Sequence, residues 1–143
     1  MRLCIYLRNK KINSIKFTIP GRLPGMNEFH HECNRHRMAG AAMKKTAMEQ
    51  CMWSMLECKK KKVHFDNCSV DITWYEPNRR RDPDNISAFG RKVIFDALQQ
   101  MGVISNDGWK QISSITERWK VDKKNPRREI VLTEVIKNEQ GNN

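Results

Sequence analysis

The chain has 143 residues, a formal net charge of +11 and an isoelectric point near 9.7. This length predicts one domain over residues 1–143 that can bury a modest core, and the positive charge favours a nucleic-acid partner. No apolar run approaches the roughly 18 residues that a membrane helix needs, and residues 1–11 lack the features of a signal peptide. We therefore expect no membrane partner and a cytoplasmic location.

The cysteines number five, an odd count, and no two of them form a C-x-x-C pair. This usage argues against a disulfide framework and for a reducing compartment. We expect most of the thiols to lie in or near the core. They are Cys4, Cys33, Cys51, Cys58 and Cys68.

The first half of the chain predicts one strand and one long helix. Apolar residues alternate over 15–19, which predicts a half-buried strand ended by Pro20. A glycine-containing loop follows at 21–25, and we interpret the polar segment 27–37 as its continuation. Strong helix formers dominate from about 39 to 59, with apolar residues at helical spacing.

The second half predicts a strand at 70–74, a turn at 76–78, a helix at 86–101 and two strands at 112–119 and 128–135. The element order β, α, β, α, β, β is typical of an α+β fold. We expect a small mixed sheet with two main helices packed on it.

We place the core of this domain at about 14–135 and expect the polar tail 137–143 to be flexible. No internal repeat or linker divides the chain.

A run of arginines leads directly into two carboxylates. Arg79, Arg80 and Arg81 are followed by Asp82 and Asp84. Arginines bind phosphate, and clustered carboxylates bind Mg²⁺. In an extended segment, residues i and i+2 point the same way, so both carboxylates can face one metal. The pattern indicates a protein that holds a nucleic-acid backbone against a metal ion.

A purely structural interpretation of the same residues is a turn followed by a helix cap. Pro83 disfavours helical backbone at Asp82, so Asp82 should be extended. Asp84 or Asn85 would then be the helix N-cap.

Asp107 is the candidate third metal ligand, although its Asn-Asp-Gly context is also that of an ordinary turn. The preceding helix spans about 24 Å, so a following strand would have to run back along it to bring Asp107 to Asp82, or the sheet would have to bring the second loop around. Lys92 could stabilise a phosphate in the transition state, or form an i, i+4 pair with Asp96 on a solvated face.

Lys59, Lys60, Lys61 and Lys62 are candidate phosphate ligands together with the three arginines; their alternative is a solvated charge run at a helix end. Trp74, Trp109 and Trp119 are interpreted as core or half-buried strand residues, with base stacking as an alternative for Trp109 beside Asp107.

Histidine and cysteine cluster in the polar segment as His30, His31, Cys33 and His36. This spacing fits no common zinc site and contains one cysteine. We interpret the segment as a polar loop that meets DNA.

Taken together, these motifs resemble the RusA-like endodeoxyribonucleases, the Holliday junction resolvases of phages and prophages. The likeness spans about residues 14–135. It rests on the 72–77 strand, the arginine run into Asp82-x-Asp84-Asn85, the Lys92-x-x-x-Asp96-Ala97-Leu98 helix, Gly102, the Asn106-Asp107 site and the 20–27 segment.

The resemblance implies an α+β homodimer whose two sites cut a four-way DNA junction symmetrically in a bacterial cell. It implies Mg²⁺ as cofactor, with Mn²⁺ as a substitute and no small-molecule cofactor. Asp82, Asp84 and Asp107 would bind the metal and Lys92 would assist. Two departures stand out: Lys92 lies about one helical turn, about 6 Å, farther along than in the family pattern, and Asn106 replaces an aspartate.

Two other functions are weighed against this one. A non-catalytic protein that binds branched DNA would share the fold and the charge, and Asn106 and the longer helix favour it. A basic RNA-binding module is disfavoured, because the chain has neither the aromatic RNP pattern nor a GxxG loop.

Overall fold

The computed structural model describes residues 4–7 and 12–136; the predicted tail at 137–143 lies outside the described residues. The strands are β1 (Cys4–Leu7), β2 (Ile12–Pro20), β3 (Cys68–Glu76), β4 (Ile112–Val121) and β5 (Arg127–Glu134). The helices are α1 (Met26–Arg35), α2 (Arg37–Ser54), α3 (Leu56–Lys60) and α4 (Pro83–Gln100).

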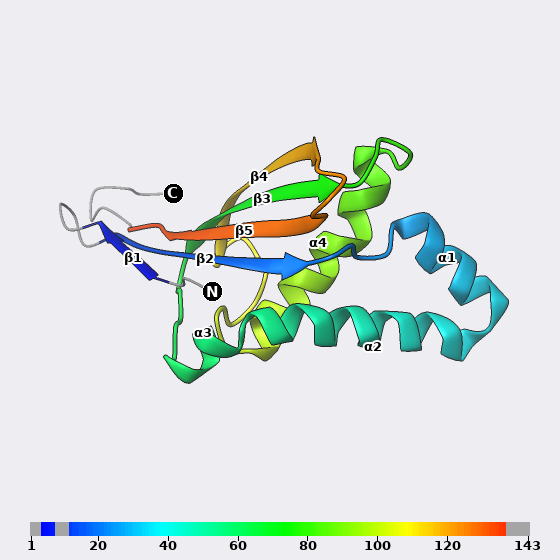
Figure 1. Ribbon diagram of the computed structural model, residues 1–143. Helices are drawn as coiled ribbons and strands as arrows, with labels where there is room; N and C mark the ends of the chain where they lie inside the picture. The colour runs from blue at the N-terminus through cyan, green and yellow to red at the C-terminus, as the bar shows by residue number, and fades with distance from the viewer. Residues whose placement is uncertain (1–3, 8–11, 137–143) are drawn as a thin grey trace.

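The strands form one mixed sheet in the order β1-β2-β5-β3-β4. β3 and β4 are parallel and joined through α4, whereas the other neighbouring pairs are antiparallel. α2 and α4, with 18 residues each, are the two main helices, and they lie on one side of the sheet (Figure 1). The predicted α+β class is confirmed. None of the helices in the described part of the chain is long and apolar enough to cross a bilayer.

Buried and more exposed side chains alternate along β2, β3 and β5, so this part of the sheet is amphipathic. In β3, every second residue from Cys68 to Glu76 is buried and those between are partly exposed. Val70, Ile72 and Trp74 therefore face the helices, together with Ile130 and Leu132 of β5. The buried thiols belong to the same core, and burial raises the pKa of Cys51 to about 12 and that of Cys68 to about 11.

The sequence predicted a loop at 27–37, and this prediction was wrong: the segment contains α1 and the start of α2. α1 contains only three apolar residues and none of its residues is fully buried, which is why the sequence indicated a polar loop there. Contacts from outside stabilise it: the Phe29 and Phe89 rings pack with centroids 4.6 Å apart. The predicted helix at 39–59 is two helices, α2 and α3, with a break at Met55.

Helix α4 begins earlier than predicted. Its N-cap is Asp82, and Pro83 occupies the first turn, where its missing N–H costs no hydrogen bond. The prediction of Asp84 or Asn85 as the cap was wrong by two to three residues. After Met101, Gly102 adopts φ 76° and turns the chain away from the helix.

Gly90 tests the packing of α4 on the sheet. A Cβ at this position would lie 2.7 Å from ring atoms of Trp74, which is closer than van der Waals contact. Gly90→Ala should lower the free energy of unfolding by about 1–3 kcal/mol, measured by urea denaturation. Gly108→Ala is the control, because its nearest neighbour would be 3.5 Å away. Equal effects of the two substitutions would contradict this packing.

Candidate nucleic-acid and metal site

The candidate site lies at the carboxyl edge of the parallel pair β3 and β4. The chain leaves β3 at Glu76, passes through 77–82 and enters the N-terminus of α4. In such a strand–loop–helix unit, ligands bind at this edge, where the helix presents unpaired N–H groups and the positive end of its dipole. The arginine run and the first two aspartates all lie on this connection.

Asp82 and Asp84 are exposed and stand at the start of α4. Asp82 is extended, as predicted, with φ −68° and ψ 151°. It occupies the N-cap position, yet its side chain makes no cap hydrogen bond. Among the described residues, neither carboxylate forms a side-chain hydrogen bond or an ion pair, although three arginines precede them. A helix cap alone therefore does not explain Asp82.

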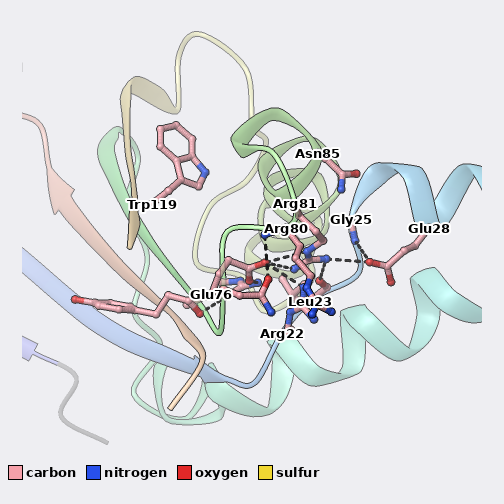
Figure 2. A network of polar contacts seen from close by, with 12 residues as sticks. Arg22, Leu23, Gly25, Glu28, Glu76, Arg80, Arg81, Asn85 and Trp119 are labelled. Atoms are coloured by element: carbon pink, nitrogen blue, oxygen red, sulfur yellow. Dashed lines mark hydrogen bonds and ion pairs between the residues drawn. The ribbon is translucent and has the colours of Figure 1, made fainter. Parts of the chain in front are cut away.

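The three arginines do not share one role. Arg81 turns inward: its Nη2 donates to Glu76 Oε1 at 2.7 Å, and its Nη1 donates to Glu28 Oε1 at 3.1 Å. Figure 2 shows Arg81 between these two carboxylates, and its side chain is 11% exposed. Arg79 and Arg80 are exposed, and their guanidinium groups have no ion-pair partner within the part of the chain that is described. Arg79 and Arg80 therefore remain candidate phosphate ligands, whereas Arg81 holds the loop in place.

Glu76 is the centre of this charged network. Besides Arg81, it accepts from Arg128 Nη2 at 2.5 Å and from Arg22 Nη2 at 3.3 Å. Burial alone would raise the pKa of Glu76, but the charge of Arg128 and the hydrogen bonds from Arg81 and Arg128 outweigh it and lower the pKa. Arg128 is fully buried, 5.2 Å from the Trp74 ring centroid, and burial lowers its pKa. These contacts anchor the 77–82 loop to the sheet.

Asn85 joins the starts of two helices. Its Oδ1 accepts a hydrogen bond from the backbone N–H of Asn27 in the first turn of α1, at 2.8 Å. The contact requires a glycine at position 25, since a Cβ there would lie 2.8 Å from the Asn85 amide. The N-terminus of α1 is therefore held beside that of α4, and both helix dipoles add positive potential at this edge.

Asp107 does not join the other two aspartates in this structure. Its Oδ2 lies 3.9 Å from Lys92 Nζ, and Lys92 is eight residues, about 12 Å, along α4 from Asp84. No group of three or more His, Cys, Asp or Glu side chains in the described part of the chain is placed to hold a metal. The reason is topological. Asp82 follows the end of β3, whereas Asp107 precedes the start of β4. Because the two strands are parallel, the end of one and the start of the other lie at opposite edges of the sheet.

Lys92 forms the i, i+4 ion pair with Asp96 that the sequence offered as its alternative role. Its Nζ lies 3.1 Å from Asp96 Oδ1, and the hydrogen bond with Asp96 raises the pKa of Lys92. Lys44 of α2 lies 3.1 Å from the other Asp96 oxygen. Lys92 is thus part of a chain of ion pairs across the middle of α4.

The remaining candidates are spread over the molecule. Lys59–Lys62 are exposed at the end of α3, and Figure 1 places α3 far from the start of α4. Trp74 is buried, Trp109 is 99% exposed and Trp119 is 43% exposed, so the expectation of a strand position for Trp109 was wrong. The His30–His36 segment belongs to α1 and its junction with α2.

The sequence interpretation missed three residues that shape the site: Glu76, Arg128 and Trp119. Arg128 had a detectable signal, because it continues the alternation of Ile130 and Leu132 and so faces inward. An inward arginine requires a buried acidic partner, which points to an acidic residue on a neighbouring strand.

A magnesium ion fits two of the three predicted ligands. Mg²⁺ in phosphate-handling sites is commonly held by one or two carboxylates, several waters and substrate phosphate oxygens. Asp82 and Asp84 are exposed, lack protein partners among the described residues and stand next to unpaired arginines, which suits that ligand set. Asp107 is not part of it in this arrangement.

Comparisons with known proteins leave the family open. No family model matches the chain, and no curated protein matches it. Among solved structures, PurLQS from Thermotoga maritima matches with 11% identity and a TM-score of 0.40 over 91% of this chain; the chain spans 19% of that protein. The OmpA-like domain of FopA1 from Francisella tularensis subsp. tularensis SCHU S4 matches with 13% identity and a TM-score of 0.38, covering 94% of this chain and 81% of that domain.

The Glu76 network should make stability depend on pH. Because the folded-state pKa of Glu76 is lowered, its contribution is complete above the ordinary carboxyl pKa of about 4.3 and is lost as pH falls through the folded value. Glu76→Gln should lower the free energy of unfolding by about 3–5 kcal/mol at pH 7, since it leaves Arg128 buried without its partner. The difference from the parent protein should shrink below about pH 4.

Glu49→Gln is the control for this measurement, because Glu49 is exposed. Denaturant unfolding of all three proteins at pH 7 and at about pH 2.5, well below the ordinary carboxyl pKa, gives the comparison. A Glu76→Gln effect that is the same at both pH values would show that the carboxylate charge is not what stabilises the loop.

Proposed function

We propose that this protein is a Mg²⁺-dependent, structure-selective DNA endonuclease that resolves four-way junctions by paired incisions. One observation carries the proposal: Asp82 and Asp84, without protein partners among the described residues, stand at a helix N-terminus beside two outward arginines. These exposed charges are hydrated and have no protein partner in the described part of the chain, so they are available to ligands. A cation and a phosphate backbone together would pair with both kinds of charge.

The chain's own residues would position the DNA strand. Arg79 and Arg80 would hold phosphates, and the N-termini of α1 and α4 add positive potential at the same edge. Asp82 and Asp84 would hold the metal, which when bound supplies an activated water and neutralises charge on the phosphate. The net charge of +11 would attract the DNA arms over a larger surface.

The assembly and setting of the proposal come from the RusA-like resemblance. Paired cuts across a four-way junction need two active sites, so a homodimer belongs to the proposal. Its setting is the cytoplasm of a bacterial cell, with a gene of phage or prophage origin. The sole cofactor would be Mg²⁺, with Mn²⁺ able to replace it, and the role of Lys92 would be to assist at the phosphate.

Removal of either candidate metal ligand should slow cleavage strongly. A synthetic four-way junction should be nicked in paired positions with Mg²⁺ and left intact with EDTA, while linear duplex of the same sequence is not cut. Asp82→Asn and Asp84→Asn should each lower the cleavage rate by about 10²–10³-fold, the range for losing one group that stabilises developing charge. Asp66→Asn is the control, because Asp66 is exposed and lies before β3, at the other edge of the sheet.

The Asp107→Asn variant distinguishes a metal site with two carboxylate ligands from one with three. The observed position of Asp107 beside Lys92 predicts a smaller loss than for Asp82→Asn. A loss of equal size would show that Asp107 reaches the metal in the DNA complex, as the family resemblance implies.

The two kinds of arginine should behave differently. Arg79→Gln and Arg80→Gln should each weaken binding to all DNA forms and reduce the slope of log K against log salt by about 1. Arg81→Gln should instead lower the melting temperature, because it breaks the contacts to Glu76 and Glu28. Binding titrations in EDTA at three salt concentrations, with thermal melts, test both; a normal melt for Arg81→Gln would contradict the assigned role.

A non-catalytic protein that binds branched DNA is the second candidate. The separation of Asp107 from the other aspartates favours it, as does Asn106 in place of a second carboxylate. Tight, selective binding of junctions with no cleavage in Mg²⁺ or Mn²⁺ would establish this alternative.

A further inference from the structure

An exposed but anchored tryptophan lies next to the candidate site. Trp119 is on β4, on the face that points toward the helices, and 43% of it is exposed. Its Nε1 donates to Ser87 Oγ of α4 at 3.0 Å, and Ser87 is itself buried. The hydrogen bond fixes the ring orientation while leaving part of the ring open. A rigid aromatic surface of this kind costs little entropy when a flat ligand binds to it.

Trp119 forms one wall of a cavity of about 250 Å³. Pro83, Ile86 and Val121 supply further apolar surface, and the polar part includes Asp82 and Arg79. The cavity is smaller than the roughly 300–1,000 Å³ typical of drug-sized ligand pockets, so one planar ring system suits it better than an extended cofactor. Figure 2 shows Trp119 on β4, above the sheet edge that carries Glu76.

The charges around the cavity favour an anionic group attached to that ring. Glu76 also lines it, but its charge is compensated by Arg128, Arg81 and Arg22. Arg79 and Lys120 both line the cavity and form no ion pair within the described part of the chain, so their two positive charges exceed the one negative charge of Asp82. The cavity thus combines an aromatic wall, apolar surface and two cations beside Asp82 that have no ion-pair partner in the described part of the chain.

We propose that this cavity receives one unpaired nucleotide of the DNA strand, with its base on Trp119 and its phosphate toward Arg79. The inference rests on the proposed function, because Asp82 would then lie next to the backbone of the same strand. Stacking on an aromatic side chain accepts any base. Bases that are already unpaired enter most easily, since duplex bases must first be unstacked. The cavity would therefore select for branch points without reading sequence.

The test compares Trp119→Leu with Trp119→Phe in EDTA, so that cleavage plays no part. The probe is a four-way junction with one unpaired 2-aminopurine at the branch point, and linear duplex of the same sequence is the reference. Trp119→Leu should weaken junction binding about tenfold or more and abolish the quenching of 2-aminopurine, while duplex binding changes less than twofold. Trp119→Phe, which keeps an aromatic face, should retain quenching and stay within about threefold of the parent protein.

Trp53→Leu is the matched control, because Trp53 is 73% exposed on α2 and does not line the cavity. Equal weakening of junction and duplex binding, or unchanged quenching in Trp119→Leu, would overturn the inference. A shift from dimer to monomer in Trp119→Leu, without loss of junction selectivity, would also overturn the inference. It would show that Trp119 contacts a second copy of the chain rather than a base.

The same experiment separates the inference from the proposed function. Mg²⁺-dependent junction cleavage that survives in Trp119→Leu with unchanged quenching would refute the cavity and leave the nuclease intact. Quenching that depends on Trp119 in a parent protein that never cleaves would refute the nuclease and leave a binding cavity for unpaired bases.

Discussion

The buried pair of Glu76 and Arg128 is the interaction on which the arrangement of the site depends. Glu76 is the last residue of β3, and Arg128 lies on the central strand β5. A buried ion pair is weak evidence for net stability, because both charges lose their hydration. Its effect here is positional: the carboxylate also binds Arg81 and Arg22, which ties the 77–82 loop and the start of the 21–25 loop to one point of the sheet.

This anchoring explains why some charged side chains of the loop form ion pairs whereas their neighbours stay exposed. Arg81 forms ion pairs with both Glu76 and Glu28, and these contacts keep its side chain away from solvent. Arg79 and Arg80 precede it on the same loop and remain outside, and Asp82 and Asp84 follow it at the start of α4. Because Arg81 anchors the loop, the two exposed arginines before it and the two exposed aspartates after it lie on the same edge of the sheet. The proposed binding of metal and DNA uses the charges that the fold leaves uncompensated.

The parallel pairing of β3 and β4 brings the apolar part of the site to the same edge. Trp119 pairs in register with Trp74, so it lies near the end of β4 that adjoins the loop after β3. α4 covers Trp74 but leaves Trp119 and Val121 partly open. The same pairing places Asp107 toward the opposite edge, since it precedes β4. Proximity to Asp82 is therefore decided by which end of a strand a residue adjoins.

Local pattern in the sequence determined the α+β class, strands β2 to β5, helix α4 and the extended backbone at Asp82, because alternation, helix formers and proline act over a few residues. It also put Arg79, Arg80, Asp82 and Asp84 on one connection, where they remain. The tertiary structure decided the rest. It placed Phe29 and Asn27 of helix α1 against Phe89 and Asn85, and it turned Arg81 inward. It also paired Lys92 with Asp96 and separated Asp107 from Asp82. Each of these depends on contacts between residues far apart in the chain, whose register and strand direction no local pattern contains.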